Sequence, residues 1–338
     1  MSLSQRWLKA AYEGSAWLTP LYPLGFLYRY LMRRRAALYR RGDKPTWRAP
    51  VPVIVVGNIT LGGTGKSPLV AWLSRWLKMQ GFSPGIVTRG YGGKAPVYPL
   101  LVTPSTDPRH SGDEPLMLAQ QTGVPVVADP QRSRGADMLM RQGCDVLISD
   151  DGLQHLAMGR DIELVVVDGA RGLGNRRCLP AGPLREAPAR LASVDAVIIN
   201  GTPQRPLGIE GVSMTLVPTR WRYLKTGQEW PLQPLPFSLP VDAMAGIGNP
   251  QRFFDTLRSL GVSGAMHPLN DHQPFDTSTF QFVSKRPVIM TAKDAVKCQA
   301  FAPPDSWVLD VEAQLPHAFE DWLLNKLSDL TQRGSTDG

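Results

Sequence analysis

A glycine-rich loop between an apolar run and an amphipathic stretch is the feature that most constrains the fold of this chain. The segment VVGNITLGGTGKSPLV spans residues 55–70. The apolar run 51–56 predicts a buried strand, and the apolar spacing after the loop predicts a helix over about 67–80. A strand that ends in such a loop and starts a helix directs several backbone N–H groups at one point, where the helix adds partial positive charge. We therefore predict a phosphate-binding loop.

The end of this loop carries the residue types that hold nucleotide phosphates. Lys66 is expected to contact the outer phosphates, and the Ser67 hydroxyl is expected to ligate Mg²⁺. The usual first glycine of such a loop is Thr60 here, which weakens the match, although the remaining glycines leave the loop free to reach positive φ. A glycine turn with an incidental lysine is the alternative. The residues assigned to nucleotide binding are Gly62, Gly63, Thr64, Gly65, Lys66 and Ser67.

The rest of the chain alternates apolar runs with helix-like stretches up to about residue 200. This alternation indicates an α/β fold with a mostly parallel sheet flanked by helices. Residues 202–240 are rich in proline, and within them we expect two short strands near 213–217 and 221–224. A second, smaller α/β pattern follows, with a helix that opens at Asn249 and Pro250. We predict an N-terminal segment (1–45), a phosphate-loop domain (46–212), a linker (213–240) and a C-terminal domain (241–338).

Acidic residues follow the strand and open the helix that this pattern places near the loop. Asp150 and Asp151 end an apolar strand, at the edge where parallel sheets bind ligands, so they are candidate Mg²⁺ ligands. Asp113 and Glu114 begin a predicted helix on the same side of the sheet, where a carboxylate can act as a base in phosphoryl transfer. Turn-forming aspartates and an acidic helix start are the structural alternatives.

His272 lies in a turn-rich stretch of the smaller unit, NDHQPF at 270–275. A lone histidine is more often a surface or structural residue. A histidine beside a carboxylate base orients that base and tunes its pKa, which is the functional alternative.

The first 50 residues carry the whole net charge of the chain. They hold ten Lys or Arg and two acids, whereas the remaining residues hold 27 of each sign. Residues 14–28 are uncharged but include Pro20 and Pro23, and the run is shorter than the roughly 20 apolar residues that span a bilayer. Dense Trp and Tyr favour the headgroup layer, and Arg33–Arg35 favour anionic lipid. We predict a monotopic, membrane-associated helical segment.

Two alternatives remain for this basic segment. It is also compatible with a helical hairpin packed on the protein's own core, or with nucleic-acid contact. The electrically neutral remainder offers no basic groove, which argues against nucleic acid. Cys144, Cys178 and Cys298 lie far apart without a CxxC spacing, so we expect reduced thiols in a cytosolic compartment rather than disulfide or metal ligands.

Several motifs occur in the order found in one known family. They are GNITLGGTGKSP, TRGYGG (88–93), SGDEP (111–115), DDGLQH (150–155), the stretch 168–186, the run 245–254, NDHQPF and TAKDAVKC (291–298). From the N-terminal segment to about residue 325 the chain resembles the tetraacyldisaccharide 4′-kinases (lipid A 4′-kinases), in which Thr at position 60 is typical. The resemblance implies a P-loop NTPase-like enzyme that transfers the γ-phosphate of ATP to the 4′-hydroxyl of a tetraacylated glucosamine disaccharide 1-phosphate, in lipid A (lipopolysaccharide) biosynthesis.

The resemblance also implies roles for single residues. Asp113 matches the catalytic base, His272 its partner from the other lobe, and Lys66 the lysine that acts on the phosphates. The residues that match acids around Mg²⁺ and nucleotide are Glu114, Asp150 and Asp151, with Ser67 as a further metal ligand. Expected contacts to the substrate are Asn58, Arg171 and Arg176, with Arg177 near them, although loop arginines are as often simply solvated.

One departure from the family lies at 291–294. The family often has glutamate where this chain has Ala292, and Lys293 and Asp294 keep their places without an assigned role. The implied partners are the lipid-linked disaccharide and an anionic membrane surface, with no nucleic acid and no protein partner. The implied location is the cytoplasmic face of the inner membrane. The alternative is a membrane-associated P-loop NTPase that acts as a switch or assembly factor, although Lys293 stands one place late for a guanine motif.

Overall fold

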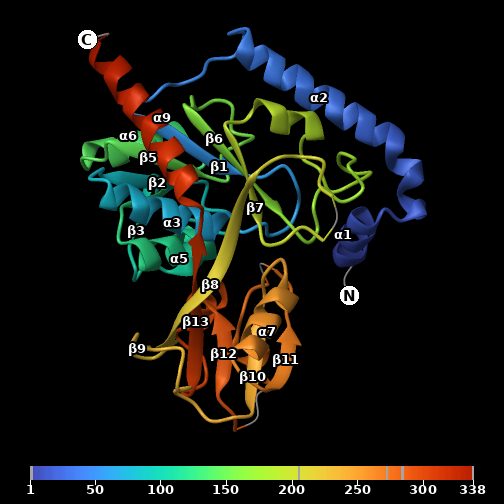
Figure 1. The fold of residues 1–338 in the computed structure, drawn as a ribbon, viewed down its shortest axis with the longest axis vertical. Helices are drawn as coiled ribbons and strands as arrows, with labels where there is room; N and C mark the ends of the chain where they lie inside the picture. The colour runs from blue at the N-terminus through green and yellow to red at the C-terminus, as the bar shows by residue number, and fades with distance from the viewer. Residues whose placement is uncertain (1–2, 205, 272, 283–284, 337–338) are drawn as a thin grey trace.

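The computed structural model describes residues 3–204, 206–271, 273–282 and 285–336 (Figure 1). In this part of the chain the strands form one continuous thirteen-stranded sheet. Its order is β11-β10-β12-β13-β8-β7-β6-β1-β5-β2-β4-β3, and β9 pairs with β8 at the side. A larger lobe and a smaller lobe share this sheet, and β8 and β13 run between them (Figure 1).

The larger lobe contains the predicted parallel sheet. Its strands are β1 (Val53–Gly57), β2 (Pro84–Thr88), β3 (Leu100–Val102), β4 (Val126–Ala128), β5 (Val146–Asp150), β6 (Ile162–Asp168) and β7 (Ala196–Asn200). Its helices are α3 (Lys66–Met79), α4 (Pro108–Ser111), α5 (Asp113–Thr122), α6 (Arg132–Arg141) and the 3₁₀ helix η2 (Pro188–Ser193). Neighbouring strands are parallel except for the edge pair β3 and β4.

Both faces of this sheet are covered, which explains why its strands are apolar throughout rather than alternating. Ile54 and Val56 of β1 face a core that contains α3 and α5. Val53 and Val55 face the opposite core, which contains α6 and the loops after β5 and β6. The predicted α/β class is therefore confirmed.

Strand β8 (Val212–Tyr223) replaces the two short strands expected in a proline-rich linker. Its first residues pair in parallel with β7, and the rest pairs antiparallel with β13 (Ser306–Gln314). Pro218, which masks the strand pattern in the sequence, lies where the register with β13 shifts between Asp310 and Val311. A proline lacks the N–H that a regular ladder needs, and an irregularity of this kind accommodates it.

The smaller lobe is a second α/β unit, as predicted. Its elements are β9 (Glu229–Trp230), β10 (Val241–Ala245), α7 (Pro250–Ser259), β11 (Gly264–Pro268), η3 (Thr277–Phe280), β12 (Val288–Thr291) and α8 (Ala292–Cys298). Asn249 caps α7 by accepting a hydrogen bond from the backbone N–H of Arg252, and Pro250 follows it. Phe253 and Phe254 of α7 pack on one face of β10 and β12, while α8 packs on the other.

The last helix, α9 (His317–Thr336), returns to the larger lobe. Phe319, Leu323 and Leu327 belong to the same core cluster as Leu73 and Trp76 of α3. We therefore group α9 with the larger lobe, although the sequence places it in the 241–338 domain. The reason is that the chain enters α9 directly from β13, which leads back to the larger lobe (Figure 1).

The N-terminal segment forms α1 (Leu3–Glu13), the 3₁₀ helix η1 (Ala16–Leu21) and α2 (Tyr22–Arg40). Helix α1 packs on the larger lobe, where Trp7 donates a hydrogen bond to the Pro180 carbonyl (3.1 Å) and Tyr12 to the Leu61 carbonyl (2.6 Å).

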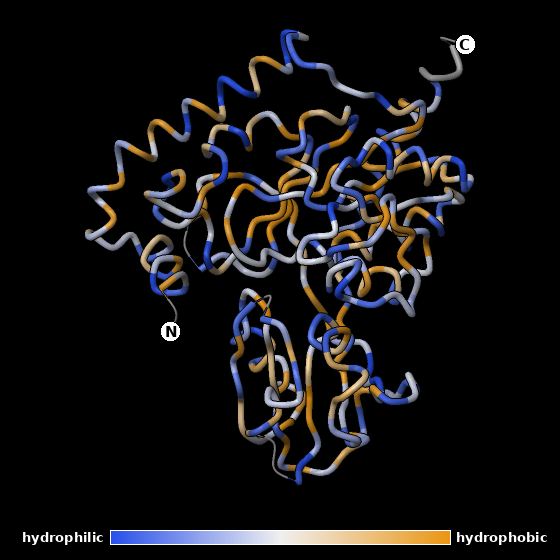
Figure 2. Tube along the Cα trace, turned by 180° about the vertical axis from the view of Figure 1, so that it is seen from behind, coloured by the Kyte–Doolittle hydropathy of each residue, from blue (hydrophilic) through white to orange (hydrophobic). Residues whose placement is uncertain are grey.

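Helix α2 instead leaves large apolar side chains in solvent. Those that are 46–60 % exposed are Leu24, Phe26, Leu27, Tyr30 and Leu31. Apolar and polar residues alternate along the helix in Figure 2. Among the described residues, none of the helices combines the length and the apolar character that crossing a bilayer requires. The three cysteines are free and buried.

The docking of α9 predicts a stability difference between two phenylalanines. Phe319 is buried against Trp72, with ring centroids 6.1 Å apart, whereas Phe26 is 56 % exposed. Replacing Phe319 by Ala should lower the free energy of unfolding by about 3–5 kcal/mol, because a large buried side chain leaves a cavity. Phe26→Ala is the matched control and should change it by less than about 0.5 kcal/mol. Urea unfolding of both variants measures this, and equal midpoints would contradict the docking.

Candidate active site

The predicted phosphate loop joins the end of β1 to the start of α3. Positive φ occurs at Gly62 (92°) and Gly65 (95°), where glycine is required. Thr60, by contrast, is buried and forms an antiparallel bridge with Leu184, which needs an extended backbone. A β-branched residue suits that conformation, so the missing first glycine does not disturb the loop.

Two buried asparagines hold the loop in shape. The side-chain amide of Asn58 donates to the carbonyl of Thr60 (2.9 Å) and to the hydroxyl of Thr64 (3.4 Å). Asn200, at the end of β7, donates to the carbonyl of Thr64 (2.9 Å). Asn58 is fully buried, so its described contacts shape the loop, and its contact with substrate stays a prediction.

A cavity of about 210 Å³ lies between the two lobes at this loop. The larger lobe contributes the loop end from Gly63 onward, and the smaller lobe contributes the turn after β10 and the start of α8. The backbones of Gly63 and Gly248 meet at its edge, because a Cβ on Gly248 would lie 2.4 Å from the Gly63 nitrogen. The loop is therefore in direct contact with the smaller lobe.

Asp151 lies beside the lysine of the loop. The Lys66 Nζ is 3.4 Å from the Asp151 Oδ1, and the Arg185 Nη1 is 3.3 Å from the Asp151 Oδ2. Burial acts to raise the pKa of Asp151, but Lys66 and Arg185 outweigh it and the pKa is lowered. Asp151 is thus an ionised partner of Lys66.

Asp150 has the features of a cation ligand. It is buried at the end of β5, and its Oδ1 has no hydrogen-bond partner among the described residues. Burial, followed by the charges of Glu114 and Asp151, raises the pKa of Asp150 to about 7. An orphaned carboxylate oxygen that senses the charges of the Glu114 and Asp151 carboxylates is an oxygen donor of the kind that Mg²⁺ prefers. Among the described residues, no group of three or more His, Cys, Asp or Glu side chains is arranged to hold a metal ion.

Asp113 and Glu114 open α5 and face the smaller lobe. Gly112, with φ of 84°, makes the turn that starts the helix. The Lys297 Nζ of α8 lies 3.7 Å from the Asp113 Oδ2, and both side chains are about nine-tenths buried. Glu114 lines the interlobe cavity. His272, the predicted partner of Asp113, lies outside the described residues.

Lys293 is the site residue that sequence reasoning left without a role. Its Nζ donates to the Glu114 Oε1 of the larger lobe (2.8 Å) and to the Asp271 Oδ1 of the smaller lobe (3.0 Å). Burial acts to lower the pKa of Lys293, but Glu114, Asp271 and Asp113 hold it above its usual value. The only sequence signal was its place in TAKD, at the start of a helix.

Asp294, in the first turn of α8, has a structural role. It is fully buried, accepts the Gly246 backbone N–H (3.0 Å) and accepts the Thr291 hydroxyl (2.7 Å). These bonds tie the end of β10 to the start of α8, which places Ala292 and Lys293 at the cavity.

The arginines predicted to bind the substrate separate in space. Arg171 donates to the carbonyl of Gly63 in the loop, and its guanidinium lies 5.0 Å from the Tyr12 ring centre. Arg176 donates to the Leu207 carbonyl (3.3 Å) and, with Arg177, lines a small cavity under α2. Only Arg171 of the three therefore lies at the phosphate loop.

Comparisons with known proteins agree with this geometry. The family model for tetraacyldisaccharide-1-P 4′-kinase matches residues 17–328. Proteins named tetraacyldisaccharide 4′-kinase from Stutzerimonas stutzeri and Azotobacter vinelandii are 46 % and 47 % identical, over 98 % and 95 % of this chain and 98 % and 96 % of their own lengths. The crystal structure of LpxK from Aquifex aeolicus, described as an "apo" form in complex with ATP, superposes with a TM-score of 0.76 at 27 % identity, covering 92 % of this chain and 99 % of that one.

The family match covers most of the chain, and it coincides with a phosphate loop that faces acidic residues across a cleft. The P-loop-like fold predicted from the glycine loop is the fold of the Aquifex protein. This chain belongs to the tetraacyldisaccharide-1-P 4′-kinase family.

Proposed function

We propose that this protein transfers the γ-phosphate of ATP to the 4′-hydroxyl of a tetraacylated glucosamine disaccharide 1-phosphate, forming a lipid A precursor. The relatives named above support the reaction, and the Aquifex protein binds ATP. The observation that carries the proposal is the ion bridge from Lys293 to Glu114, because it joins the helix that begins with Asp113 to the cavity that contains the phosphate loop.

The nucleotide occupies the interlobe cavity. Its phosphates accept the N–H groups of residues 62–67 at the start of α3, where the helix dipole favours negative charge. Lys66 exchanges its contact with Asp151 for the outer phosphates. The adenine ring of the nucleotide fits against the apolar side of the cavity, which is lined by Leu216, Ile247, Phe253, Leu309 and Val311.

Mg²⁺ would be held by the Ser67 hydroxyl and by carboxylates from Glu114, Asp150 and Asp151. When bound, the ion supplies positive charge that offsets the charge on the transferring phosphoryl group. Lys66 adds to this effect from the loop side. The protein therefore acts mainly by positioning and by electrostatics.

Asp113 takes the proton of the attacking sugar hydroxyl. Its position at the start of α5 directs it toward the smaller lobe, beside Lys297 and next to Glu114. His272 is proposed to orient it. Lys293 is a positioning residue, since it holds carboxylates from both lobes at one point.

The acceptor is a lipid, and the N-terminal segment brings the enzyme to it. The exposed apolar face of α2 is proposed to lie in the cytoplasmic leaflet of the inner membrane, with arginines facing anionic lipid. Arg171 is the arginine best placed to contact the substrate near the loop. Substrate contact by Arg176 and Asn58 remains a prediction.

Replacing Asp113, the proposed catalytic base, tests the proton-transfer step. Asp113→Ala should lower kcat by on the order of 10² or more, with ATP affinity little changed, because proton transfer is lost while the phosphate loop is intact. The assay is transfer of labelled γ-phosphate to lipid acceptor, and Asp137→Ala, an exposed acid on α6, is the matched control. Normal turnover by Asp113→Ala would rule out Asp113 as the catalytic base. ATP hydrolysis at the same rate with and without the lipid acceptor would favour the alternative, a P-loop NTPase that acts as a switch.

Breaking the ion bridge tests the coupling of the lobes. Lys293→Met should lower kcat by about tenfold to 10²-fold, because the two partly buried carboxylates of Glu114 and Asp271 then repel each other and the geometry loosens. Lys293→Arg keeps the charge and should recover part of the rate. Lys225→Met, exposed on the smaller lobe, is the control. Steady-state kinetics at saturating ATP measure these effects, and an unchanged kcat for Lys293→Met would contradict the role.

Polar substitutions on α2 test the membrane contact. Leu24 and Leu27 are 51 % and 53 % exposed, and replacing both by Ser should reduce binding to vesicles by roughly tenfold or more, because apolar area no longer enters the bilayer. Leu101→Ser with Leu239→Ser, two exposed leucines elsewhere, is the matched control. Vesicle co-sedimentation measures the loss. Equal binding of the two double variants would place the membrane contact elsewhere.

A further inference from the structure

Arg252 is an arginine of the smaller lobe that faces the interlobe cavity. It lies on α7 on the same side as Asn249, Phe253 and Thr256, which recur at helical spacing and also line the cavity. Arg258, the other arginine of α7, is exposed and does not belong to the lining. Of the two arginines of this helix, Arg252 is therefore the one that can meet a ligand in the cleft.

The side chain of Arg252 reaches across to the larger lobe. A Cβ on Gly201, which follows β7, would clash with the Arg252 Nη2, so the guanidinium occupies the space beside this glycine. The φ of Gly201 is 79°, which also favours glycine. The preceding residue, Asn200, donates to the Thr64 carbonyl of the phosphate loop (2.9 Å). The guanidinium thus lies one residue away from a side chain that contacts the phosphate loop.

Arg252 also differs from the other cations of the cavity in its pairing. In the described part of the lining, Lys66 pairs with Asp151, and Lys293 pairs with two acids. Arg252 is the third cation, and its side chain forms neither an ion pair nor a hydrogen bond with the residues that the structure describes. A bound anion would therefore be its first partner of opposite charge within this part of the protein.

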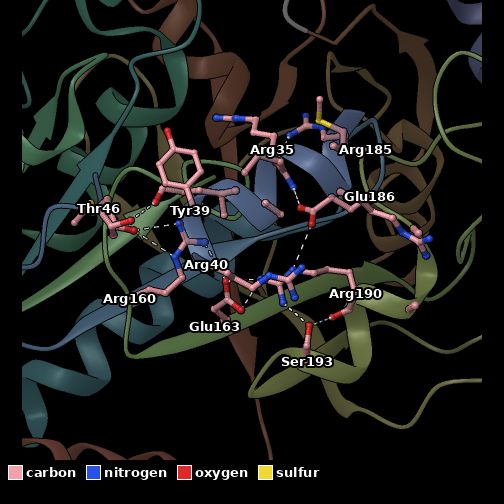
Figure 3. Close-up of a pocket in the computed structure, with 18 of the residues that line it drawn as sticks. Arg35, Tyr39, Arg40, Thr46, Arg160, Glu163, Arg185, Glu186, Arg190 and Ser193 are labelled. Atoms are coloured by element: carbon pink, nitrogen blue, oxygen red, sulfur yellow. Dashed lines mark hydrogen bonds and ion pairs between the residues drawn. The ribbon is translucent and has the colours of Figure 1, made fainter. Parts of the chain in front are cut away.

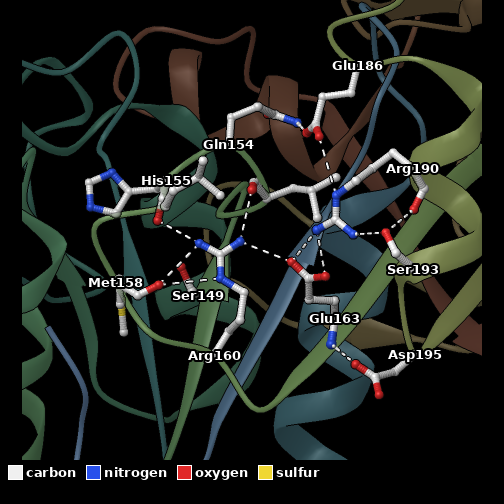
Figure 4. Close-up of polar contacts among 12 residues, drawn as sticks. Ser149, Gln154, His155, Met158, Arg160, Glu163, Glu186, Arg190, Ser193 and Asp195 are labelled. Atoms are coloured by element: carbon white, nitrogen blue, oxygen red, sulfur yellow. Dashed lines mark hydrogen bonds and ion pairs between the residues drawn. The ribbon is translucent and has the colours of Figure 1, made fainter. Parts of the chain in front are cut away.

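Half-buried arginines elsewhere in the larger lobe do have acidic partners. Arg160 donates to the Glu163 Oε1 (3.0 Å) and Arg190 donates to the Glu163 Oε2 (2.6 Å) (Figure 4). Arg190 also pairs with Glu186 (3.3 Å) (Figure 3). Because a charge that is partly removed from water is costly without a partner, the contrast indicates that the partner of Arg252 is a ligand.

We propose that Arg252 binds the phosphate chain of ATP from the smaller lobe, opposite the phosphate loop. This inference rests on the proposed function, since it requires ATP in the interlobe cavity. Phosphate is the part of ATP that carries negative charge, and a guanidinium offers it a planar fork of donors. Adenine and ribose are uncharged, so they would leave Arg252 without a counter-charge.

A phosphate chain held from both sides connects the two lobes. The phosphate loop belongs to the larger lobe, and α7 belongs to the smaller lobe. The link would lie near the point where the backbones of Gly63 and Gly248 already meet. ATP then favours the arrangement in which the lobes are in contact, because that arrangement brings Arg252 and the loop to the same ligand.

Helix α7 supplies a matched control for the test. Arg252→Gln and Arg258→Gln remove the same charge from the same helix, but only Arg252 lines the cavity. Calorimetric titration with ATP, without lipid acceptor, should show a Kd raised roughly tenfold to 100-fold in Arg252→Gln, because charge-assisted hydrogen bonds are lost. The Kd of Arg258→Gln should stay within about twofold of the wild type. Equal affinities of the two variants would overturn the proposal.

A series of ligands separates the phosphates from the rest of the nucleotide. Competition against a fluorescent ATP analogue gives the affinities of ADP and adenosine for the wild type and for Arg252→Gln. The variant should lose affinity for ATP and ADP, or for ATP alone where the contact is to the γ-phosphate. Its affinity for adenosine should be unchanged, because adenosine carries no phosphate. An equal loss for adenosine would assign Arg252 to the base or the ribose and overturn the proposal.

A conservative variant separates a ligand contact from a structural one. Arg252→Lys retains the charge but loses the planar fork, so its affinity for ATP should lie between those of the wild type and Arg252→Gln. Urea unfolding without nucleotide should give both variants midpoints close to that of the wild type. Lower midpoints together with unchanged affinity for ATP would make Arg252 a structural contact of Gly201 and contradict the proposal. Failure of the proposed function has a different signature, because the wild type would then bind no ATP.

Discussion

The antiparallel pairing of β8 with β13 is the interaction on which the arrangement of the active site depends. Strand β8 leaves the larger lobe beside β7, and β13 returns the chain to it, so one ladder carries both connections between the lobes. Because α9 then packs on α3, the smaller lobe is fastened at both ends of its sequence. The register of this ladder sets where Gly248 meets the phosphate loop and where Lys293 meets Glu114.

The lysines of the resulting cleft are paired with carboxylates, and these pairs determine which ligand the cleft can accept. Lys66 is held by Asp151, and Lys293 by Glu114 and Asp271, so each of these lysines has carboxylate partners before phosphate enters. Breaking such pairs without replacement is costly, whereas exchanging one anion for another is not. Nucleotide phosphates can replace the carboxylates as partners of the lysines, and a divalent cation can replace the lysines as partner of the carboxylates. The cleft is thus prepared for a ligand that carries both signs of charge.

The N-terminal segment links this chemistry to the membrane. Helix α1 is attached to the phosphate loop by the hydrogen bond from Tyr12 to Leu61. Helix α2 follows it, with exposed apolar side chains in its first half and arginines mainly in its second half. Two of the three expectations for this segment were a membrane contact and a hairpin packed on the protein. Each applies to one helix: α1 packs on the larger lobe, and α2 is the proposed contact with lipid.

The local pattern of the sequence determined the alternation of strands and helices, the loop before α3 and the cap at Asn249, because these follow from the chemistry of neighbouring residues. Long-range pairing decided the rest. Thr60 replaces a glycine because Leu184 pairs with it, and Pro218 lies within a strand because β13 shifts register there. Lys293 gained a role only when folding brought Glu114 to it, 179 positions away in sequence. An ion pair between such distant residues leaves no periodic trace along the chain, and only the tertiary structure shows it.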